Sequence, residues 1–227
     1  MVALGRPNWA EASELGRFVA HTAVVRFDAV GRSTRLLESF PGQEFINTET
    51  QPLAPPLFGA AVFEVGEDRV YVGYPDRYEI GVLTLEGELE AVFGVDRPRR
   101  RVTPDDAQGA VQEMVGPREG EGARRLEAFA QDHVPEAFPY FDRMLLASTG
   151  DVWLRRFPSP VDVIHEWDIF SGGDDKQYLG FIEVPTAFEP FAVDEDRVAG
   201  RWVGEFDEHY VRVYVLESRP AEPTSDN

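Results

Sequence analysis

The chain has 227 residues, 43% of them hydrophobic and 12% aromatic, so it can bury a core and does not have the composition of a disordered protein. Its 41 acidic and 22 basic residues give a net charge of −19, which repels phosphate backbones and anionic lipid and disfavours nucleic acid and membrane surfaces as partners. Cations or basic partners stay open. No apolar run approaches the ~20 residues of a membrane span, so no membrane insertion is predicted. The absence of cysteine excludes disulfides, thiolate nucleophiles and cysteine metal sites.

A faint strand pattern opens the chain between residues 17 and 40. Arg17–Ala20 and Ala23–Phe27 are predicted as two strands, Asp28–Gly31 as a turn and Ser33–Phe40 as the partner strand. No earlier strand is evident. The first residues lack a basic segment followed by an apolar one, so no secretion signal is predicted.

The stretch 59–94 has a clearer pattern of four short strands separated by turn residues. The predicted strands are Gly59–Val65, Asp68–Tyr74, Tyr78–Leu85 and Leu89–Phe93. The third carries Tyr78, Ile80 and Val82 on one face and Leu83 and Leu85 on the other. Apolar residues on both faces predict a sheet that is covered on both sides.

A helical insertion is predicted at 97–139. Thr103 is a typical N-cap, Pro104 suits the first helical position, and two aspartates follow in the first turn. This helix continues over Ala107–Val115, and Gly116–Gly122 ends it. A second helix is predicted at Ala123–His133.

The pattern of 59–94 returns at 140–184 and again, with three strands, at 191–216. The predicted strands are Phe141–Ala147, Val152–Phe157, His165–Phe170, Tyr178–Val184, Phe191–Val193, Arg197–Val203 and His209–Leu216. Residues 217–227 are polar, contain two prolines and are predicted to form a flexible tail.

The spacing of these units indicates a repeat. Val152 corresponds to Val198, 46 residues further on, and four-stranded units of about 40–50 residues are typical of β-propeller blades. The predicted fold is all-β, with about three and a half four-stranded antiparallel blades at 17–40, 59–94, 140–184 and 191–216 in one domain of residues 1–216. A β-sandwich without a true repeat is the alternative.

Several segments also carry a family resemblance. In order they are PGQEF, DRVYVGYPDRYEIGVLTLEGELEAVF, DRPRRRVTPDD, VWLRRF, DRVAGRW and DEHYVRVYVLE. Together they resemble the C-terminal part of a poorly characterised bacterial family of six-bladed β-propellers, close to the NHL-type and TolB-like propellers. The resemblance covers most of residues 17–216, and the entry into the helical insertion, DRPRRRVTPDD, is its most distinctive piece.

The resemblance implies a fold of six radial blades. Members of the family are mostly exported or lipid-anchored, but the localisation of this chain stays open. The resemblance supplies no catalytic motif. Six blades need roughly 270 residues, so this chain is expected to be a truncated propeller or to complete its ring as a homodimer. An open arc would otherwise expose sheet faces and strand edges to water.

Ligands of propellers usually meet the loops between second and third strands. This places the candidate ligand-binding residues on equivalent rim loops: Asp76, Arg77, Tyr78, Asp162, Ile164, His165, Glu205, Asp207, Glu208 and His209. The insertion adds Arg99, Arg100, Arg101 and His133 to the same rim.

Each group also has a simpler interpretation. The acidic loop 205–208 could hold a hard cation such as Ca²⁺ or simply be solvated. His165 and His209 could form a base or ligand pair, or be polar strand-end residues. Arg99–Arg101 could bind an anion, although pairing with local carboxylates is the preferred interpretation.

The sequence favours a non-catalytic binding module for a protein or small ligand, because no nucleophile motif, P-loop or dinucleotide fingerprint is present. No catalytic residue, resident metal site or cofactor is assigned. The alternatives are a Ca²⁺-dependent hydrolase or lactonase of propeller type, which needs acids converging from several blades, and a structural protein that assembles as a homodimer.

Overall fold

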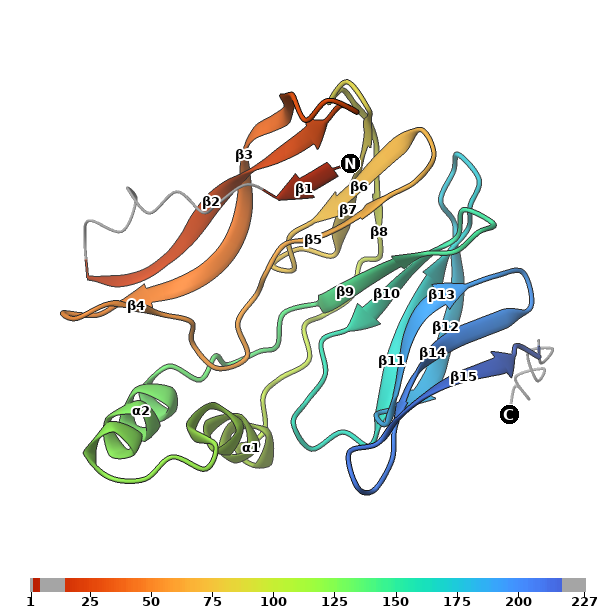
Figure 1. Ribbon diagram of the computed structural model, residues 1–227. Helices are drawn as coiled ribbons and strands as arrows, with labels where there is room; N and C mark the ends of the chain where they lie inside the picture. The colour runs from red at the N-terminus through yellow and green to blue at the C-terminus, as the bar shows by residue number, and fades with distance from the viewer. Residues whose placement is uncertain (1, 5–14, 218–227) are drawn as a thin grey trace, which may run out of the picture.

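The computed structural model describes residues 2–4 and 15–217 (Figure 1). Within these residues the chain forms four antiparallel β-sheets, arranged one after another in chain order, and a helical hairpin between the second and third sheets. The predicted all-β fold with a short helical insertion is therefore confirmed. The four sheets do not close into a propeller ring.

The first sheet is larger than predicted. Its strands, in spatial order, are β1 (Val2–Leu4), β2 (Gly16–Phe27), β3 (Ser33–Asn47) and β4 (Pro52–Leu53). The blade boundary of 17–40 is thus wrong at both ends, and the two strands expected at 17–27 are the single strand β2. The strands β1 and β4 are the elements that the sequence did not reveal.

The extension of β3 depends on an irregular pairing. Pro41 lies opposite His21, next to a shift of register between Ala20 and His21. Proline has no amide hydrogen and is tolerated in sheets at such bulges. Gly42 follows, where an added Cβ would lie 2.8 Å from the carbonyl oxygen of Ala20, so the two backbones approach too closely for a side chain. A proline and glycine that looked like a strand end therefore lie inside a strand.

The second and third sheets match the predicted four-stranded units. The second contains β5 (Val62–Val65), β6 (Arg69–Gly73), β7 (Glu79–Thr84) and β8 (Leu89–Gly94). The third contains β9 (Phe141–Leu146), β10 (Val152–Arg156), β11 (Ile164–Phe170) and β12 (Tyr178–Pro185). In both, each strand pairs with the next one along the chain.

The fourth sheet has three strands among the described residues: β13 (Phe188–Val193), β14 (Arg197–Val203) and β15 (His209–Val215). Its first strand begins three residues earlier than the predicted start at Phe191. The predicted tail lies almost entirely outside the described residues.

Apolar residues on alternate faces hold neighbouring sheets together. Between the first and second sheets, Val24 packs in one cluster with Leu83. Ile80, on the opposite face of β7, packs with Phe141 and Phe170 between the second and third sheets. The prediction that β7 is covered on both sides is therefore confirmed, and it follows from the period-2 alternation of side chains along a strand.

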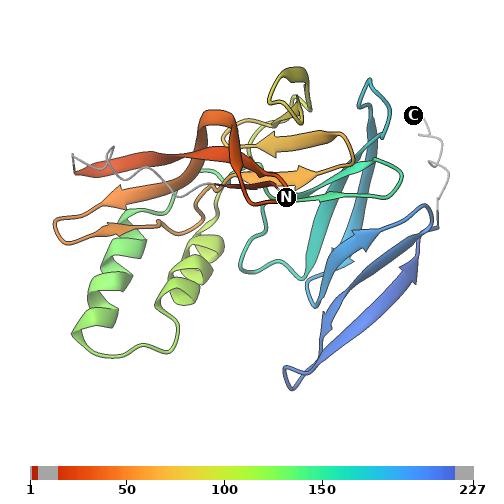
Figure 2. The same cartoon turned by 45° about the horizontal axis from the view of Figure 1, so that its top comes forward.

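The third sheet repeats this arrangement. In β10, Val152 and Leu154 face the second sheet, whereas Trp153 lies in a separate cluster with Phe188 and Val198 of the fourth sheet. Figure 1 and Figure 2 show the resulting fan of sheets, with the first and last sheets at opposite ends. The first strands β5 and β9 lie against each other, as do β9 and β13, so the inner strands of successive sheets are neighbours as in a propeller.

The helical hairpin consists of α1 (Pro104–Val115) and α2 (Glu121–Asp132). Thr103 caps α1 as predicted: its side chain accepts the amide hydrogen of Asp106, and the Asp106 carboxylate accepts that of Thr103. The second helix begins two residues before the predicted Ala123. Neither helix is long and apolar enough to cross a bilayer, and no other helix occurs in the described part of the chain.

Candidate functional site

A groove of about 1130 Å³ lies between the helical hairpin and the rim of the third sheet. One wall is the linker from β4 to β5, and the other comprises α1, the middle of α2 and the loop between β10 and β11. The β10–β11 loop is one of the rim loops that the repeat marks as candidate ligand contacts. The volume lies at the upper end of ordinary ligand pockets.

Prolines and apolar side chains form the walls of this groove. The contributing residues are Pro55, Pro56, Leu57, Phe58, Met114, Leu126, Phe157, Pro158, Pro160 and Val161. Proline fixes its own φ and restricts the residue before it, so both loop walls have few backbone conformations to lose when a ligand binds. Leu57 has a φ of 53°, a left-handed conformation that costs a branched residue energy and is maintained here by its surroundings.

Three polar side chains lie along one side of the groove. Arg155 donates two hydrogen bonds to the Asp142 carboxylate, at 2.8 and 2.6 Å, and its guanidinium lies 5.9 Å from the centre of the Trp167 ring. His165 is partly buried beside this ion pair. Burial and the Arg155 charge lower the pKa of His165, so its imidazole is neutral at pH 7 and can both donate and accept a hydrogen bond.

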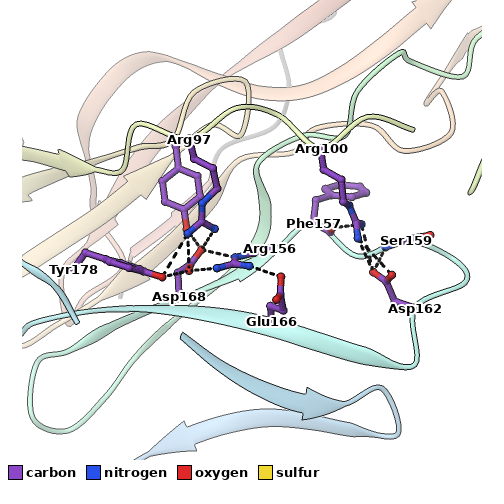
Figure 3. Close-up of polar contacts among 10 residues, drawn as sticks. Arg97, Arg100, Arg156, Phe157, Ser159, Asp162, Glu166, Asp168 and Tyr178 are labelled. Carbon is purple, nitrogen blue, oxygen red and sulfur yellow. Dashed lines mark hydrogen bonds and ion pairs between the residues drawn. The ribbon is translucent and has the colours of Figure 1, made fainter. Parts of the chain in front are cut away.

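Two polar contacts fix the loop that carries Ser159 and Asp162. The hydroxyl of Ser159 donates to Asp106 of α1, and Arg100 forms an ion pair with Asp162 at 3.2 Å (Figure 3). The Arg100 guanidinium also lies 4.2 Å from the centre of the Phe138 ring. These contacts connect the groove wall to α1 and to the strand-to-helix linker, so the wall is supported from two sides.

No protein-family model and no curated protein matches this chain.

The predicted rim residues divide among different places. Asp162 and His165 line the groove. Asp76 and Arg77 instead line a hollow of about 570 Å³ between the first and second sheets. The loops of the second and third sheets are nevertheless linked, since the Tyr140 amide donates to the Pro75 carbonyl at 2.9 Å.

The last predicted loop lies elsewhere. Glu205 and Asp207 are exposed in the turn between β14 and β15, and His209 is exposed at the start of β15; none of the three lines the groove. Glu208 accepts a hydrogen bond from the Phe206 amide at 2.8 Å, so this acidic turn binds its own backbone. Ile164, at the start of β11, is exposed.

The arginine run of the insertion pairs with groups nearby. Besides the Arg100–Asp162 pair, Arg99 donates to the carbonyl oxygen of Asp76 and lies over the Tyr140 ring. The preferred interpretation of local pairing is confirmed for Arg100. His133, which ends α2, stacks on Phe129 and contacts its carbonyl oxygen at 2.7 Å.

A buried carboxylate cluster, which the sequence reading missed, lies between the second and third sheets (Figure 3). Asp168 has no exposed surface. Arg97 contacts its two oxygens at 2.9 and 3.3 Å, and Arg156 at 2.9 and 2.8 Å. The hydroxyls of Tyr78 and Tyr178 donate to the same carboxylate. Tyr78, a predicted ligand residue, is therefore buried and already bonded.

Burial alone would raise the pKa of Asp168, but the hydrogen bonds from Arg156, Tyr78 and Tyr178 outweigh it and lower the pKa. Burial and the Asp168 charge raise the pKa of Tyr78. Arg156 also binds Glu166, so the charges in the cluster are balanced. The signal in the sequence was the presence of charged residues within the apolar strands VWLRRF and HEWDIF, because charges inside an apolar strand need buried partners.

Across residues 2–4 and 15–217 no group of three or more histidine, aspartate or glutamate side chains is arranged to hold a metal ion. The acidic turn 205–208 is not such a group, and two carboxylates of the groove, Asp142 and Asp162, form ion pairs with Arg155 and Arg100.

Proposed function

We propose that this chain is a non-catalytic binding module, related to six-bladed β-propellers, which holds its ligand in the groove between the helical hairpin and the third sheet. The observation that carries the proposal is the groove itself: proline-rich apolar walls beside a fixed Asp142–Arg155 pair and the neutral His165. Apolar walls with a few positioned polar groups are the usual composition of a ligand site.

The ligand that fits best is a short, extended segment of a basic protein. An open groove of about 1130 Å³ suits a chain of several residues rather than a compact metabolite. The apolar walls accept alternate side chains, while Asp142, Arg155 and His165 offer hydrogen bonds to a peptide backbone. The net charge of −19 attracts basic segments and repels acidic ones.

Fluorescence polarisation with two pools of labelled random hexapeptides, one rich in Lys and Arg and the other in Asp and Glu, tests this proposal. We expect the basic pool alone to bind. Replacing His165 by Ala should weaken binding about tenfold, the effect of one lost hydrogen bond of about 1.4 kcal/mol. The matched control is His209→Ala, because His209 begins the equivalent strand of the fourth sheet but lies outside the groove.

Equal binding of both pools would contradict the charge argument, and equal loss in the two histidine variants would place the ligand outside the groove. Absence of binding by either pool would reject the peptide ligand.

A further inference from the structure

The outer edge of the fourth sheet is open in the described part of the chain. The second and third sheets have four strands each, whereas the fourth ends at β15, whose far side pairs with no strand among residues 2–4 and 15–217. An open edge presents unpaired amide and carbonyl groups, which readily pair with another strand.

The edge strand also exposes an unusual row of apolar side chains. Val211, Val213 and Val215 are 75%, 59% and 65% exposed and alternate along β15, so they share one face of the sheet. In β14 the residues opposite them are Arg201, Ala199 and Arg197. Three β-branched residues in a row on an exposed edge are favourable in a sheet but costly in water.

The same three valines direct their backbone groups outward. The Leu216 amide donates to the Asp196 carbonyl at 2.7 Å, and the Gly204 amide donates to the Glu208 carbonyl at 2.9 Å. In an antiparallel pair such bonded positions alternate with non-bonded ones. Even-numbered positions of β15 therefore bond to β14, and the backbone groups of Val211, Val213 and Val215 face the open edge.

We propose that a second copy of this chain pairs its β15 antiparallel to this edge, with the two-fold axis at Val213, so that the two fourth sheets form one six-stranded sheet. The pairs are Val213 with the second copy's Val213, and Val211 with its Val215. The two valine rows then lie side by side as one patch of six valines on the same face of the sheet. This inference is independent of the groove and its ligand.

The sequence of β15 is self-complementary in this register. Arg212 lies opposite the second copy's Tyr214, and His209 lies opposite its Glu217, which places a basic residue against an acidic one at both ends. A shift of the axis to Arg212 would place two arginines directly opposite each other, which is unfavourable. The register at Val213 is therefore preferred.

Charge also makes this edge the natural contact between two copies of an acidic chain. Residues 209–216 contain no carboxylate, and Arg197 and Arg201 flank the valine row, although the chain as a whole has a net charge of −19. Two molecules that repel each other elsewhere can approach here with the least electrostatic cost. A homodimer contact of this kind is isologous, so it closes after two subunits and does not propagate.

Sedimentation velocity and light scattering of the full chain test the dimer. We expect a species of twice the 25.5 kDa chain mass. Val213→Lys should raise the dissociation constant by about 100-fold or more, because it places two like charges at the two-fold axis and removes the contact between the two valines. The matched control is Val92→Lys, since Val92 is 55% exposed on β8, the outer strand of the second sheet. The dimer should persist in this variant.

A charge-swap experiment separates this contact from a folding defect. Val213→Lys and Val213→Glu should each be monomeric alone, and an equimolar mixture should restore a dimer, because lysine then lies opposite glutamate. The chain has no cysteine, so Val213→Cys should also form a disulfide-linked dimer under mild oxidation, given a Cα separation of about 5.5 Å for directly opposed residues.

A monomeric wild-type chain at about 100 μM would overturn the proposal, since a specific contact is populated well below that concentration. A dimer that survives Val213→Lys, or a mixture of the charge variants that stays monomeric, would likewise overturn it. A dimer without cysteine cross-linking at Val213 would reject the register.

Discussion

At the scale of single residues, Asp168 shows how a charge is maintained inside this fold. Its carboxylate accepts paired hydrogen bonds from two arginines and one from each of two tyrosines, so its lone pairs are fully used. Arg97 comes from the linker after β8 and Arg156 from the end of β10, so the cluster joins the second and third sheets through the start of the insertion.

The first prediction concerns the charge of this residue. Asp168→Asn keeps the size of the side chain but leaves Arg97 and Arg156 without their shared counter-ion. Both arginines are about one-quarter exposed, so water relieves part of the penalty and we expect a loss of about 3 kcal/mol in the free energy of unfolding. Urea denaturation measures it. Asp174→Asn, at a carboxylate that is 93% exposed, should change the free energy by less than about 0.5 kcal/mol.

The second prediction is the pH dependence of the same group. The pKa of Asp168 is lower in the folded chain than its unfolded value near 4, so its contribution to stability is complete above that value. The contribution is lost as the pH falls through the folded pKa. Urea midpoints at pH 6, 4 and 3 should therefore fall more steeply below pH 4 in the wild type than in Asp168→Asn. Parallel curves would show that the pKa of Asp168 is the same in the folded and unfolded chain.

At the scale of elements, the sequence predicted those strands, turns and helix ends that are determined by residues close together in the chain. The turn at Glu86-Gly87-Glu88, the strands of the second and third sheets and the N-cap at Thr103 all follow from nearby residues. The full first sheet was not predicted from nearby residues, because the predicted strand ended at Phe40, directly before Pro41 and Gly42. Their position inside β3 depends on β2, which supplies the bulge opposite Pro41 and the close approach to Gly42.

The third prediction tests the start of α1. Thr103→Ala removes the hydroxyl that accepts the Asp106 amide hydrogen and one bond to the Asp106 carboxylate. We expect a loss of about 1 kcal/mol in unfolding free energy, the usual effect of an N-cap. Faster hydrogen exchange should appear in the first turn of α1. Thr103→Ser, which keeps the hydroxyl, is the control, and equal exchange in both variants would contradict a role for the cap.

At the scale of the whole molecule, neighbouring sheets of the described residues pack on each other through apolar residues on both faces of the central strands. Val152 and Val198, the two positions matched by the 46-residue spacing, are both buried in the second strands of their sheets. The sequence did not reveal which of the predicted rim loops line the same groove. The helical hairpin adds a wall to the groove of the third sheet only, so equivalent positions such as His165 and His209 have different surroundings.

The last prediction concerns the charge of −19, which strains the folded chain through self-repulsion. Salt has two opposing effects. It weakens surface ion pairs such as Arg125–Glu121 and Arg32–Asp28, which are individually worth about 0–1 kcal/mol. It also screens the net repulsion, because the Debye length falls from about 30 Å at 0.01 M to about 10 Å at 0.1 M. The Asp168 cluster is buried and is screened much less.

Repulsion should dominate, since the acidic excess is spread over the chain while the exposed pairs are few and weak. We expect the melting temperature to rise by a few degrees between 0.01 and 0.3 M NaCl, where about 1 kcal/mol corresponds to 2–4 °C for a chain of this size. Scanning calorimetry at pH 7 measures it, at a protein concentration low enough to keep Val213→Lys monomeric. The rise should persist in that variant, because self-repulsion acts within one chain. A rise confined to the wild type would mean that salt acts through association, and a fall would mean that surface ion pairs dominate.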